Sequence, residues 1–406
     1  MVIIIGSGAG GGILAMELAK ANIPVTIIEK GPFINSNEAF NYYDKSDEGL
    51  DLLKTTCIGG STMVSAGNAV RSLEEELFNL GIDLSEEFEY IENLINVHEL
   101  DDSHFGKGTN LFLESSKKLG LNGTKMPKFI QESKCLQCGN CAFGCPTNAK
   151  WTSKDFIQVA CENGAELLCN CECTELLVKN NLIIGVKILN NGKEEVLKSD
   201  TVILSAGAIN SAILLRKIGL PAGEKLFTDP FVTVGGVLKN INFYKEVQMN
   251  ALIKKEHFIL SPHFSTFIPN KINKKDVENK DILSIMVKIP DEGKGHVLDD
   301  GTVVKINTIR DVQYLAEGSA TAGAILKEAG VDPSTIVSTL FRSAHPGGTA
   351  AIGEVVNKNL ETKIKGLYVS DASVLPTSPG VPPILTILAL SKKLASYLIK
   401  DYSNCF

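Results

Sequence analysis

Four cysteines within eleven residues form a dense group of potential metal ligands. They follow the pattern Cys135-x2-Cys138-x2-Cys141-x3-Cys145, and Pro146 comes next. This is the ligand spacing of bacterial ferredoxins, in which cysteine thiolates hold an iron–sulfur cluster. The sequence has no second run of this kind, so a single cluster would use Cys145 itself, take a remote cysteine or stay a three-iron cluster. Structural zinc and a metal-free loop are the competing interpretations.

A glycine-rich loop near the N-terminus predicts a phosphate-binding site. Residues 2–5 and 25–28 are apolar and predict two strands, and residues 13–21 between them predict a helix. In such a unit the first glycine permits a tight turn, the second lets a pyrophosphate approach the backbone, and the third lets the helix pack on the strand. Glu29 closes the second strand and could accept ribose hydroxyls. The alternative is an ordinary glycine turn beside a surface glutamate.

The order of the predicted elements indicates an α/β protein with an inserted α+β part. Strand patterns at 165–178, 183–189, 201–205 and 366–370 surround helical patterns, which we expect at 73–100, 109–119, 151–163, 311–329 and 384–399. Between 231 and 307 short alternating runs predict an antiparallel sheet with one face in water. We therefore expect a discontinuous nucleotide domain (1–72, 151–230 and 341–406), a helical segment with the cysteines (73–150) and a substrate domain (231–340).

Length, charge and hydropathy exclude several classes of protein. The 406 residues carry 47 acidic and 40 basic side chains, and a net charge of −7 disfavours a general nucleic-acid or anionic-membrane binder. The sequence contains no apolar run of the roughly 18 residues that would predict a transmembrane segment, and no basic stretch precedes the first apolar run as in a secretory signal. The clustered cysteines indicate a reducing compartment, so we expect a cytoplasmic protein.

Further segments resemble the glucose–methanol–choline (GMC) family of FAD-dependent oxidoreductases. They are Thr55–Arg71, residues 200–219, His345–Gly353 and the stretch from Gly366 onward, and they occur in the order of the family. The resemblance implies a Rossmann-like FAD-binding domain of the GMC and glutathione-reductase type, with an antiparallel-sheet substrate domain. It is weak across 231–340, where the family varies.

The resemblance also implies which residues hold FAD. The cofactor-binding set comprises Gly6, Gly8, Ala9, Gly10, Gly11, Glu29, Gly59, Gly60, Ser61, Thr62, Cys173, Ala206, Gly207, Asp371, Ala372, Pro383 and Ile384. A helix that begins at Ile384 would point its positive N-terminal end at the flavin, where reduced flavin carries negative charge. Some members attach FAD to a histidine just after the Gly-Gly-Ser loop. No histidine lies between Gly59 and His98, so we expect non-covalent FAD.

His345 is the predicted catalytic base. Alcohol oxidation needs a base that titrates near the working pH, which suits histidine. Of the six histidines, only His345 lies in a family motif, His-x-x-Gly-Thr. The family's second catalytic residue, a His or Asn, is replaced by Pro382 and Pro383, which have no side-chain donor or acceptor. His257 and His263 from the variable domain are candidates to assist.

These features predict an FAD-dependent dehydrogenase acting on the CH–OH group of an alcohol, polyol or sugar. Hydride would pass to flavin N5, and an iron–sulfur cluster at Cys135, Cys138, Cys141 and Cys145 would pass electrons to a partner protein or a quinone. Two alternatives stay open. One is a lyase that uses FAD only structurally, and the other is a non-catalytic electron-transfer subunit.

Overall fold

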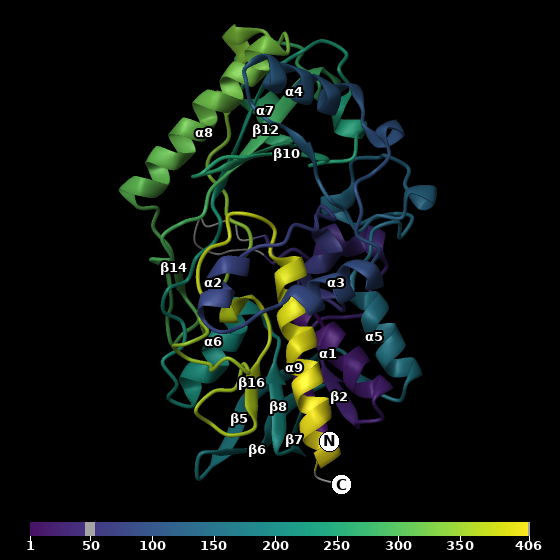
Figure 1. Ribbon diagram of the computed structural model, residues 1–406, viewed down its shortest axis with the longest axis vertical. Coiled ribbons are helices and arrows are strands. Elements are labelled where there is room, and N and C mark those ends of the chain that lie inside the picture. The colour runs from purple at the N-terminus through teal and green to yellow at the C-terminus, as the bar shows by residue number, and fades with distance from the viewer. Residues whose placement is uncertain (45–52, 405–406) are drawn as a thin grey trace.

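A parallel sheet of five short strands lies in the lower half of the molecule (Figure 1). This computed structural model describes residues 1–44 and 53–404. The strands pair in the order β16-β8-β1-β2-β4, and every neighbouring pair is parallel. The strands are β1 (Val2–Ile5), β2 (Val25–Ile28), β4 (Glu166–Leu168), β8 (Thr201–Leu204) and β16 (Leu367–Val369). Three separate stretches of the chain thus build one sheet.

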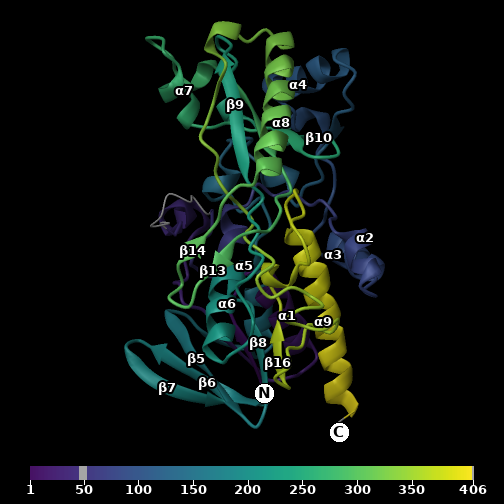
Figure 2. The same ribbon diagram turned by 90° about the vertical axis from the view of Figure 1, so that its left-hand side faces the viewer.

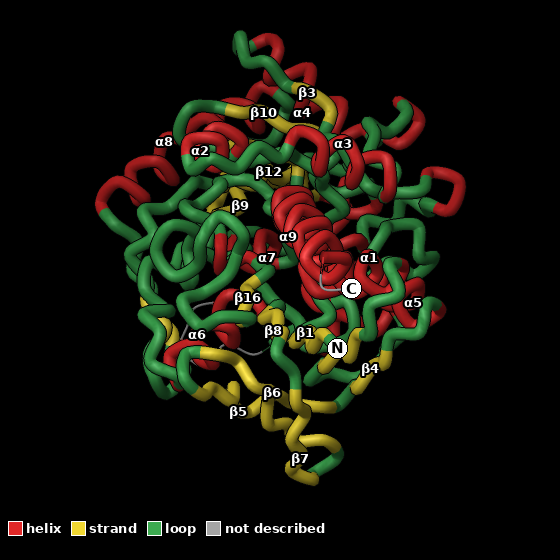
Figure 3. The backbone as a smooth tube through the Cα atoms, turned by 60° about the horizontal axis from the view of Figure 1, so that its bottom comes forward, coloured by secondary structure: helices red, strands yellow, loops and turns green. Residues whose placement is uncertain are grey.

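Helices and a small sheet cover the two faces of the parallel sheet (Figure 2). Helix α1 packs against α5 and α9, and the three lie together beside the sheet (Figure 3). A three-stranded antiparallel sheet covers the other side, and α6 contacts its first strand. These elements are α1 (Ala9–Lys20), α5 (Ser153–Glu162), α6 (Gly207–Lys217), α9 (Ile384–Asn404), β5 (Cys171–Lys179), β6 (Leu182–Asn190) and β7 (Lys193–Lys198).

A six-stranded antiparallel sheet forms the upper part of the molecule, in the order β15-β9-β12-β11-β10-β3. Its strands are β3 (Thr124–Lys125), β9 (Phe231–Val237), β10 (Ala251–Lys254), β11 (Ile259–Pro262), β12 (Ile282–Lys288) and β15 (Val337–Ser338). Helix α8 (Ile309–Glu328) packs on β9 and β12, and α4 (Lys107–Lys118) packs on α8. The remaining elements are α2 (Glu74–Asn79), α3 (Ser85–Leu94), α7 (Phe267–Lys271), β13 (His296–Val297) and β14 (Val303–Val304).

The predicted fold class is confirmed, and so is the antiparallel sheet, but its predicted water-exposed face is wrong. β12 is buried along its whole length. Alternate residues point to opposite faces of a strand. Leu283, Ile285 and Val287 pack in the apolar cluster under α8, whereas Met286 and Lys288 face an internal cavity. The polar positions of the alternating pattern therefore line a cavity inside the protein.

The predicted helix over 73–100 is in fact two helices, α2 and α3. Gly81 has a φ of +78°, and hydrogen bonds from the N–H groups of Gly81 and Ile82 to the carbonyls of Phe78 and Leu77 end α2. A glycine in this conformation is a common helix terminator. The Asp83 carboxylate then accepts hydrogen bonds from Ser85 N and Oγ, which begins α3.

Among the described residues, no helix combines the length and the apolar character that crossing a membrane would require.

Two glycines of α8 provide a matched test of how closely this helix packs on the sheet. A Cβ at Gly318 would lie 2.3 Å from Cγ1 of Val287, whereas a Cβ at Gly323 would meet nothing within 4 Å. We predict that Gly318→Ala lowers stability by about 1–3 kcal/mol through overpacking. Gly323→Ala should raise stability by up to about 1 kcal/mol, because alanine favours helix. Thermal denaturation of both variants measures this. Equal effects would contradict the packing described.

Candidate active site

One large cavity of about 660 Å³ lies between the parallel sheet and the six-stranded sheet. Most of the predicted cofactor-binding residues line it, and so does His345. The lining members are Gly6, Gly8, Ala9, Gly10, Glu29, Gly60, Ser61, Thr62, Cys173, Ala206, Gly207, Asp371, Ala372, Pro383 and Ile384. Gly11 and Gly59 do not line it, and they pack just behind the wall. The fold thus brings residues that are hundreds of positions apart in the chain to one chamber.

The glycine loop between β1 and α1 leaves space for a ligand at one position. A Cβ at Gly6 would lie 2.2 Å from the Ser205 carbonyl oxygen, and one at Gly10 would lie 1.8 Å from that of Ser370. A Cβ at Gly11 would lie 1.9 Å from the carbonyl oxygen of Gly6. These three glycines are needed for close packing. Gly8 differs, because a Cβ there would meet nothing within 4 Å and Gly8 faces the cavity at the start of α1.

Glu29 holds the glycine loop in shape. Its Oε2 accepts hydrogen bonds from Ser7 N (3.0 Å) and Ser7 Oγ (2.6 Å), and its Oε1 accepts one from Gly31 N (2.8 Å). Burial raises the pKa of Glu29, and the hydrogen bonds from Ser7 and Gly31 oppose the rise. A carboxylate oxygen has two lone pairs, so Oε1 keeps capacity for one further donor, such as a ribose hydroxyl.

Asp371 joins the C-terminal segment to the start of α6. Its Oδ2 accepts hydrogen bonds from Gly207 N (2.9 Å) and Ser211 Oγ (2.6 Å), and its Oδ1 accepts one from Ser373 N (2.8 Å). Burial raises its pKa, and these donors oppose the rise. The carboxylate therefore positions the cavity wall around Ala206, Gly207 and Ala372.

The loop at 59–62 packs directly on the glycine loop. A Cβ on Gly60 would lie 3.1 Å from Cα of Gly8, and Gly59 N donates to Ser7 Oγ over 3.0 Å. Ser153, at the start of α5, donates from Oγ to the carbonyl oxygens of Ser7 (2.9 Å) and Gly8 (2.8 Å). Sequence reasoning missed Ser153, because a lone serine at a helix start carries no motif.

His345 lies in the loop between β15 and β16. The buried carboxylate of Asp229 is its hydrogen-bonding partner. Its Nδ1 lies 3.0 Å from Oδ2 of Asp229, and Lys288 Nζ lies 3.1 Å from the same nitrogen. Burial, together with the positive charge of Lys288, holds the pKa of His345 well below its usual range. The lowered pKa favours the neutral ring, in which one nitrogen is free to accept a proton.

Asp229 is wholly buried and is held on its other oxygen by the C-terminal segment. Its Oδ1 accepts hydrogen bonds from Ser378 Oγ (2.5 Å) and Gly380 N (3.1 Å). Burial raises the pKa of Asp229, and the charge of Lys288 opposes the rise. Asp229 and His345 both have positive φ, 44° and 56°. This conformation is uncommon outside glycine and concentrates at functional sites.

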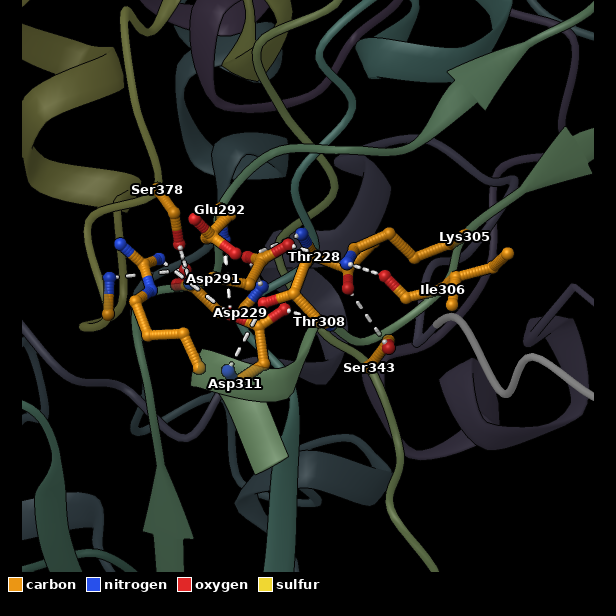
Figure 4. Close-up of polar contacts among 12 residues, drawn as sticks. Thr228, Asp229, Asp291, Glu292, Lys305, Ile306, Thr308, Asp311, Ser343 and Ser378 are labelled. Carbon is orange, nitrogen blue, oxygen red and sulfur yellow. Dashed lines mark hydrogen bonds and ion pairs between the residues drawn. The ribbon is translucent and has the colours of Figure 1, made fainter. Parts of the chain in front are cut away.

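A second carboxylate fixes the backbone of Asp229 (Figure 4). Oδ1 of Asp291 accepts hydrogen bonds from the N–H groups of Thr228 and Asp229, each at 3.1 Å. Lys305 Nζ forms an ion pair with Oδ2 of Asp291 at 3.0 Å, and both side chains are buried. Ser378 links the Asp229 carboxylate to the backbone of Asp291, since its Oγ donates to Oδ1 of Asp229 and accepts from Asp291 N. The position of Asp229 is thus set from several directions.

Three of the four remaining candidate residues line the large cavity, and His257 does not. Pro382 and Pro383 line the cavity and bring no side-chain polar atom to it. His263 lines the cavity, and burial lowers its pKa to about 4. The ring of His257 stacks on Tyr314 at 4.2 Å, away from the cavity wall. Sequence reasoning missed Asp229 and Lys288, which belong to no motif.

The four clustered cysteines line a second, small cavity, and Gly139 of the same loop borders both cavities. Cys135 Sγ accepts a hydrogen bond from Gln137 N (3.5 Å), and Cys145 Sγ accepts one from Ala149 N (3.3 Å). Burial works to raise the pKa of Cys145, but hydrogen bonds from nearby backbone N–H groups leave it lowered. Over residues 1–44 and 53–404, no group of three or more His, Cys, Asp or Glu is arranged to hold a single metal ion.

Lys150 connects the cysteine loop to the loop at 59–62. Its buried Nζ donates to the carbonyl oxygens of Thr62 (3.0 Å), Met63 (2.9 Å) and Cys141 (3.1 Å). Burial lowers the pKa of Lys150 to about 8, and Cys141 and Cys145 oppose this. One side chain thus ties the cysteine cavity to the wall of the large cavity.

The parallel sheet, the glycine loop at a helix N-terminus and a cavity that suits a long nucleotide define an FAD-binding α/β enzyme. The chain belongs to the GMC oxidoreductase family. Models of the two family regions match residues 52–241 and 305–391, and a model described as an FAD binding domain matches residues 1–41.

Individual proteins are similar to this chain over almost its whole length. The uncharacterized protein MJ1450 of Methanocaldococcus jannaschii is 34% identical over 400 residues, which cover 98% of this chain and 99% of that protein. Long-chain-alcohol oxidase FAO4B of Arabidopsis thaliana is 22% identical over 510 residues, covering 99% of this chain and 67% of that protein.

Two solved structures share the fold over almost the whole chain. Formate oxidase of Aspergillus oryzae has a TM-score of 0.78 at 15% identity and covers 100% of this chain and 99% of its own. Pyridoxine 4-oxidase from Mesorbium loti has a TM-score of 0.75 at 14% identity and covers 98% of both chains.

Gly8 tests the position of the cofactor. Gly8→Val should leave the apoprotein as stable as the parent, because φ is −66° and the added atoms point into open space. FAD affinity should fall by roughly tenfold or more, equal to at least about 1.4 kcal/mol, because the side chain fills the space that a pyrophosphate needs. Fluorescence titration of apoprotein with FAD measures this. Unchanged affinity would show that FAD does not pass Gly8.

Proposed function

We propose that the protein is an FAD-dependent dehydrogenase that oxidises the CH–OH group of an alcohol, polyol or sugar. The observation that carries the proposal is the His345–Asp229 pair, which projects a neutral imidazole into the cavity that the FAD-binding residues line. The relatives add support, since one is a long-chain-alcohol oxidase and a solved structure with this fold is a pyridoxine 4-oxidase.

The described residues fit FAD at several points along the cavity. Gly8 and the N-terminus of α1 would hold the pyrophosphate, and Glu29 would hold the adenosine ribose. Cys173, Ala206 and Gly207 would border the adenosine half. Ser61, Thr62 and Ala372 would border the ribityl chain and flavin. FAD supplies the hydride acceptor when it is bound, and we expect it to be held without a covalent link.

Ile384 begins α9 at the cavity wall, and Pro383 precedes it. The partial positive charge of the helix N-terminus would favour the anionic form of reduced flavin. Proline fits this place because the first helical residues have no backbone acceptor for their N–H groups.

Asp229 determines which ring nitrogen of His345 carries the proton. When Nδ1 carries a proton and donates it to Oδ2 of Asp229, the lone pair of the ring lies on Nε2. Nε2 can then take the proton of a substrate hydroxyl, and the carboxylate stabilises the positive imidazolium that results. Since Oδ1 is occupied by Ser378 and Gly380, the carboxylate presents Oδ2 to the histidine.

We also propose that the four cysteines would hold an iron–sulfur cluster, which would supply one-electron transfer when bound. All four line one small cavity, Gly139 of their loop borders the large cavity, and backbone N–H groups donate to two of the sulfurs. Such hydrogen bonds favour thiolates and tune cluster potentials. A cluster would make a partner protein or a quinone the acceptor. The nine described cysteines are free, which agrees with a cytoplasmic setting.

The catalytic pair gives a direct test of the proposal. We predict that His345→Ala keeps FAD and slows flavin reduction by roughly a hundredfold or more, the usual scale for a lost base. Flavin bleaching under nitrogen against a panel of alcohols and sugars is the measurement. Bleaching at the parent rate would show that another residue is the base. Parent protein that no alcohol or sugar bleaches would favour the lyase or the electron-transfer subunit.

Asp229→Asn should also slow flavin reduction, by on the order of a thousandfold. Ser378 Oγ and Gly380 N donate to Oδ1, so an amide would place its oxygen there and its NH2 toward His345. The NH2 would donate to Nδ1 and move the ring proton to Nε2, which then cannot act as a base. Ser378→Ala removes one donor to Oδ1 and should cost less than Asp229→Asn. Full activity in Asp229→Asn would contradict this role.

The cysteine site gives an independent test. Protein purified under nitrogen should contain iron and acid-labile sulfide and give a paramagnetic signal in one redox state. Cys138→Ser should lower the iron content, while Cys161→Ser, an exposed cysteine outside the cluster, should leave it unchanged. One zinc per chain without iron would contradict the electron-transfer role, because zinc cannot change oxidation state.

A further inference from the structure

Two buried lysines, Lys128 and Lys150, lie beside the cavity of the four cysteines. Lys128 is 0% exposed and Lys150 is 2% exposed. Ile130 forms an antiparallel bridge with Lys150, and Lys128, two residues before Ile130, points to the same side of this short ladder. Ile130 and Lys150 both line the cysteine cavity. Fully buried lysines are rare unless a partner offsets their charge.

The hydrogen bonds of both lysines require the ammonium form. Nζ of Lys128 donates to Oδ1 of Asn68 (2.6 Å) and to the carbonyl oxygens of Gln248 (2.8 Å) and Ala66 (3.1 Å). Nζ of Lys150 donates to four carbonyl oxygens, those of Ser65 (2.7 Å), Met63 (2.9 Å), Thr62 (3.0 Å) and Cys141 (3.1 Å). A neutral amine has only two N–H donors, so three or more acceptors indicate an ammonium in each case.

Neither ammonium has a carboxylate partner. Across residues 1–44 and 53–404, no Asp or Glu pairs with Lys128 or Lys150, and every acceptor of the two is uncharged. The buried Lys305 differs, because its Nζ lies 3.0 Å from Oδ2 of Asp291. Carbonyl dipoles replace only part of the lost hydration, so two buried ammonium groups still need negative charge nearby.

The cysteine loop is the group that can supply this negative charge. Burial lowers the pKa of Lys128 to about 7, and Cys141 and Cys135 oppose the fall. Lys150 contacts the Cys141 carbonyl oxygen and lines the cavity of the four sulfurs. Neutral thiols would leave both ammonium groups uncompensated. Metal ligation requires thiolates, so a bound metal centre would provide the missing charge.

The two ammonium groups also lie next to the wall of the large cavity. Five of the residues that accept their hydrogen bonds line that cavity, namely Thr62, Ser65, Ala66, Asn68 and Gln248. The lysines are therefore placed between the large cavity and the cysteine cavity. An electron that leaves the first for the second moves toward two fixed positive charges.

We propose that Lys128 and Lys150 are the counter-charges of an anionic tetrathiolate metal centre in the cysteine cavity. This inference rests on the cluster proposed above. Four thiolates around an iron–sulfur core of two positive charges leave two negative charges, which the two ammonium groups balance. One-electron reduction adds a third negative charge, and both lysines keep their protons. The ammonium groups favour this more negative form, so they make the site a better electron acceptor.

The test is a redox titration of protein purified under nitrogen, with dithionite as the reductant and the paramagnetic signal of the centre as the readout. Lys150→Gln and Lys128→Gln remove the charge and keep two N–H donors. We expect each to lower the ratio of reduced to oxidised centre at a fixed potential by roughly tenfold, equal to about 59 mV for a one-electron couple.

Lys134→Met is the matched control, because Lys134 is exposed next to Cys135 and water weakens the effect of its charge. The ratio should change by less than about threefold in this variant.

The direction of the change separates charge from structure. A substitution that only loosened the loop would admit water, which stabilises the more highly charged reduced form and raises the ratio. An unchanged or raised ratio in the Gln variants would overturn the inference. FAD content and thermal stability are measured on the same samples, and Lys128→Gln alone decides if Lys150→Gln does not fold.

The metal content of the parent separates this inference from the proposed function. One zinc per chain would contradict the electron-transfer role, and release of zinc to a chelator then becomes the readout. Both Gln variants should lose zinc at a roughly tenfold lower chelator concentration than the parent, and equal concentrations would overturn the inference. A parent that holds no metal would overturn it as well, while flavin bleaching by an alcohol would still support the proposed oxidation.

Discussion

The buried carboxylate of Asp229 is the interaction on which the site depends. Its two oxygens bind groups from different parts of the chain, since Oδ2 contacts His345 and Oδ1 accepts from Ser378 and Gly380. A buried carboxylate without partners would be strongly unfavourable, so these contacts must form together. Asp229 lies two residues before β9, a strand of the six-stranded sheet. It therefore couples the orientation of His345 to the junction between the two large sheets.

Local motifs made much of the cavity wall predictable. The glycine loop, Glu29 and the 59–62 segment each act through a short stretch of backbone, so their residue types and spacing show in the sequence. Asp229 and Lys288 could not be found in this way. Each is a single polar residue in or beside a strand, and each is paired with His345, which lies 116 or 57 positions away in the sequence. Only tertiary structure brings such pairs together.

The main sheets of the fold were also predictable from the sequence. Apolar runs identified the parallel strands, and an alternating pattern identified the six-stranded sheet. The same pattern was misleading about solvent, because polar positions such as Lys288 face an internal cavity, and alternation cannot distinguish a cavity from bulk water. β7 was missed because Lys193–Lys198 is mostly charged and exposed, so it lacks an apolar strand pattern. It forms a strand by pairing with β6.

The account requires a neutral His345 that carries its proton on Nδ1. Nitrogen NMR of holoenzyme labelled with 15N-histidine measures this directly, because the two ring nitrogens have different shifts when protonated and unprotonated. The chain has six histidines, and comparison with His345→Asn identifies the signals of interest. We predict a protonated Nδ1 and an unprotonated Nε2 at neutral pH. A proton on Nε2 with none on Nδ1, or a doubly protonated ring, would contradict the account.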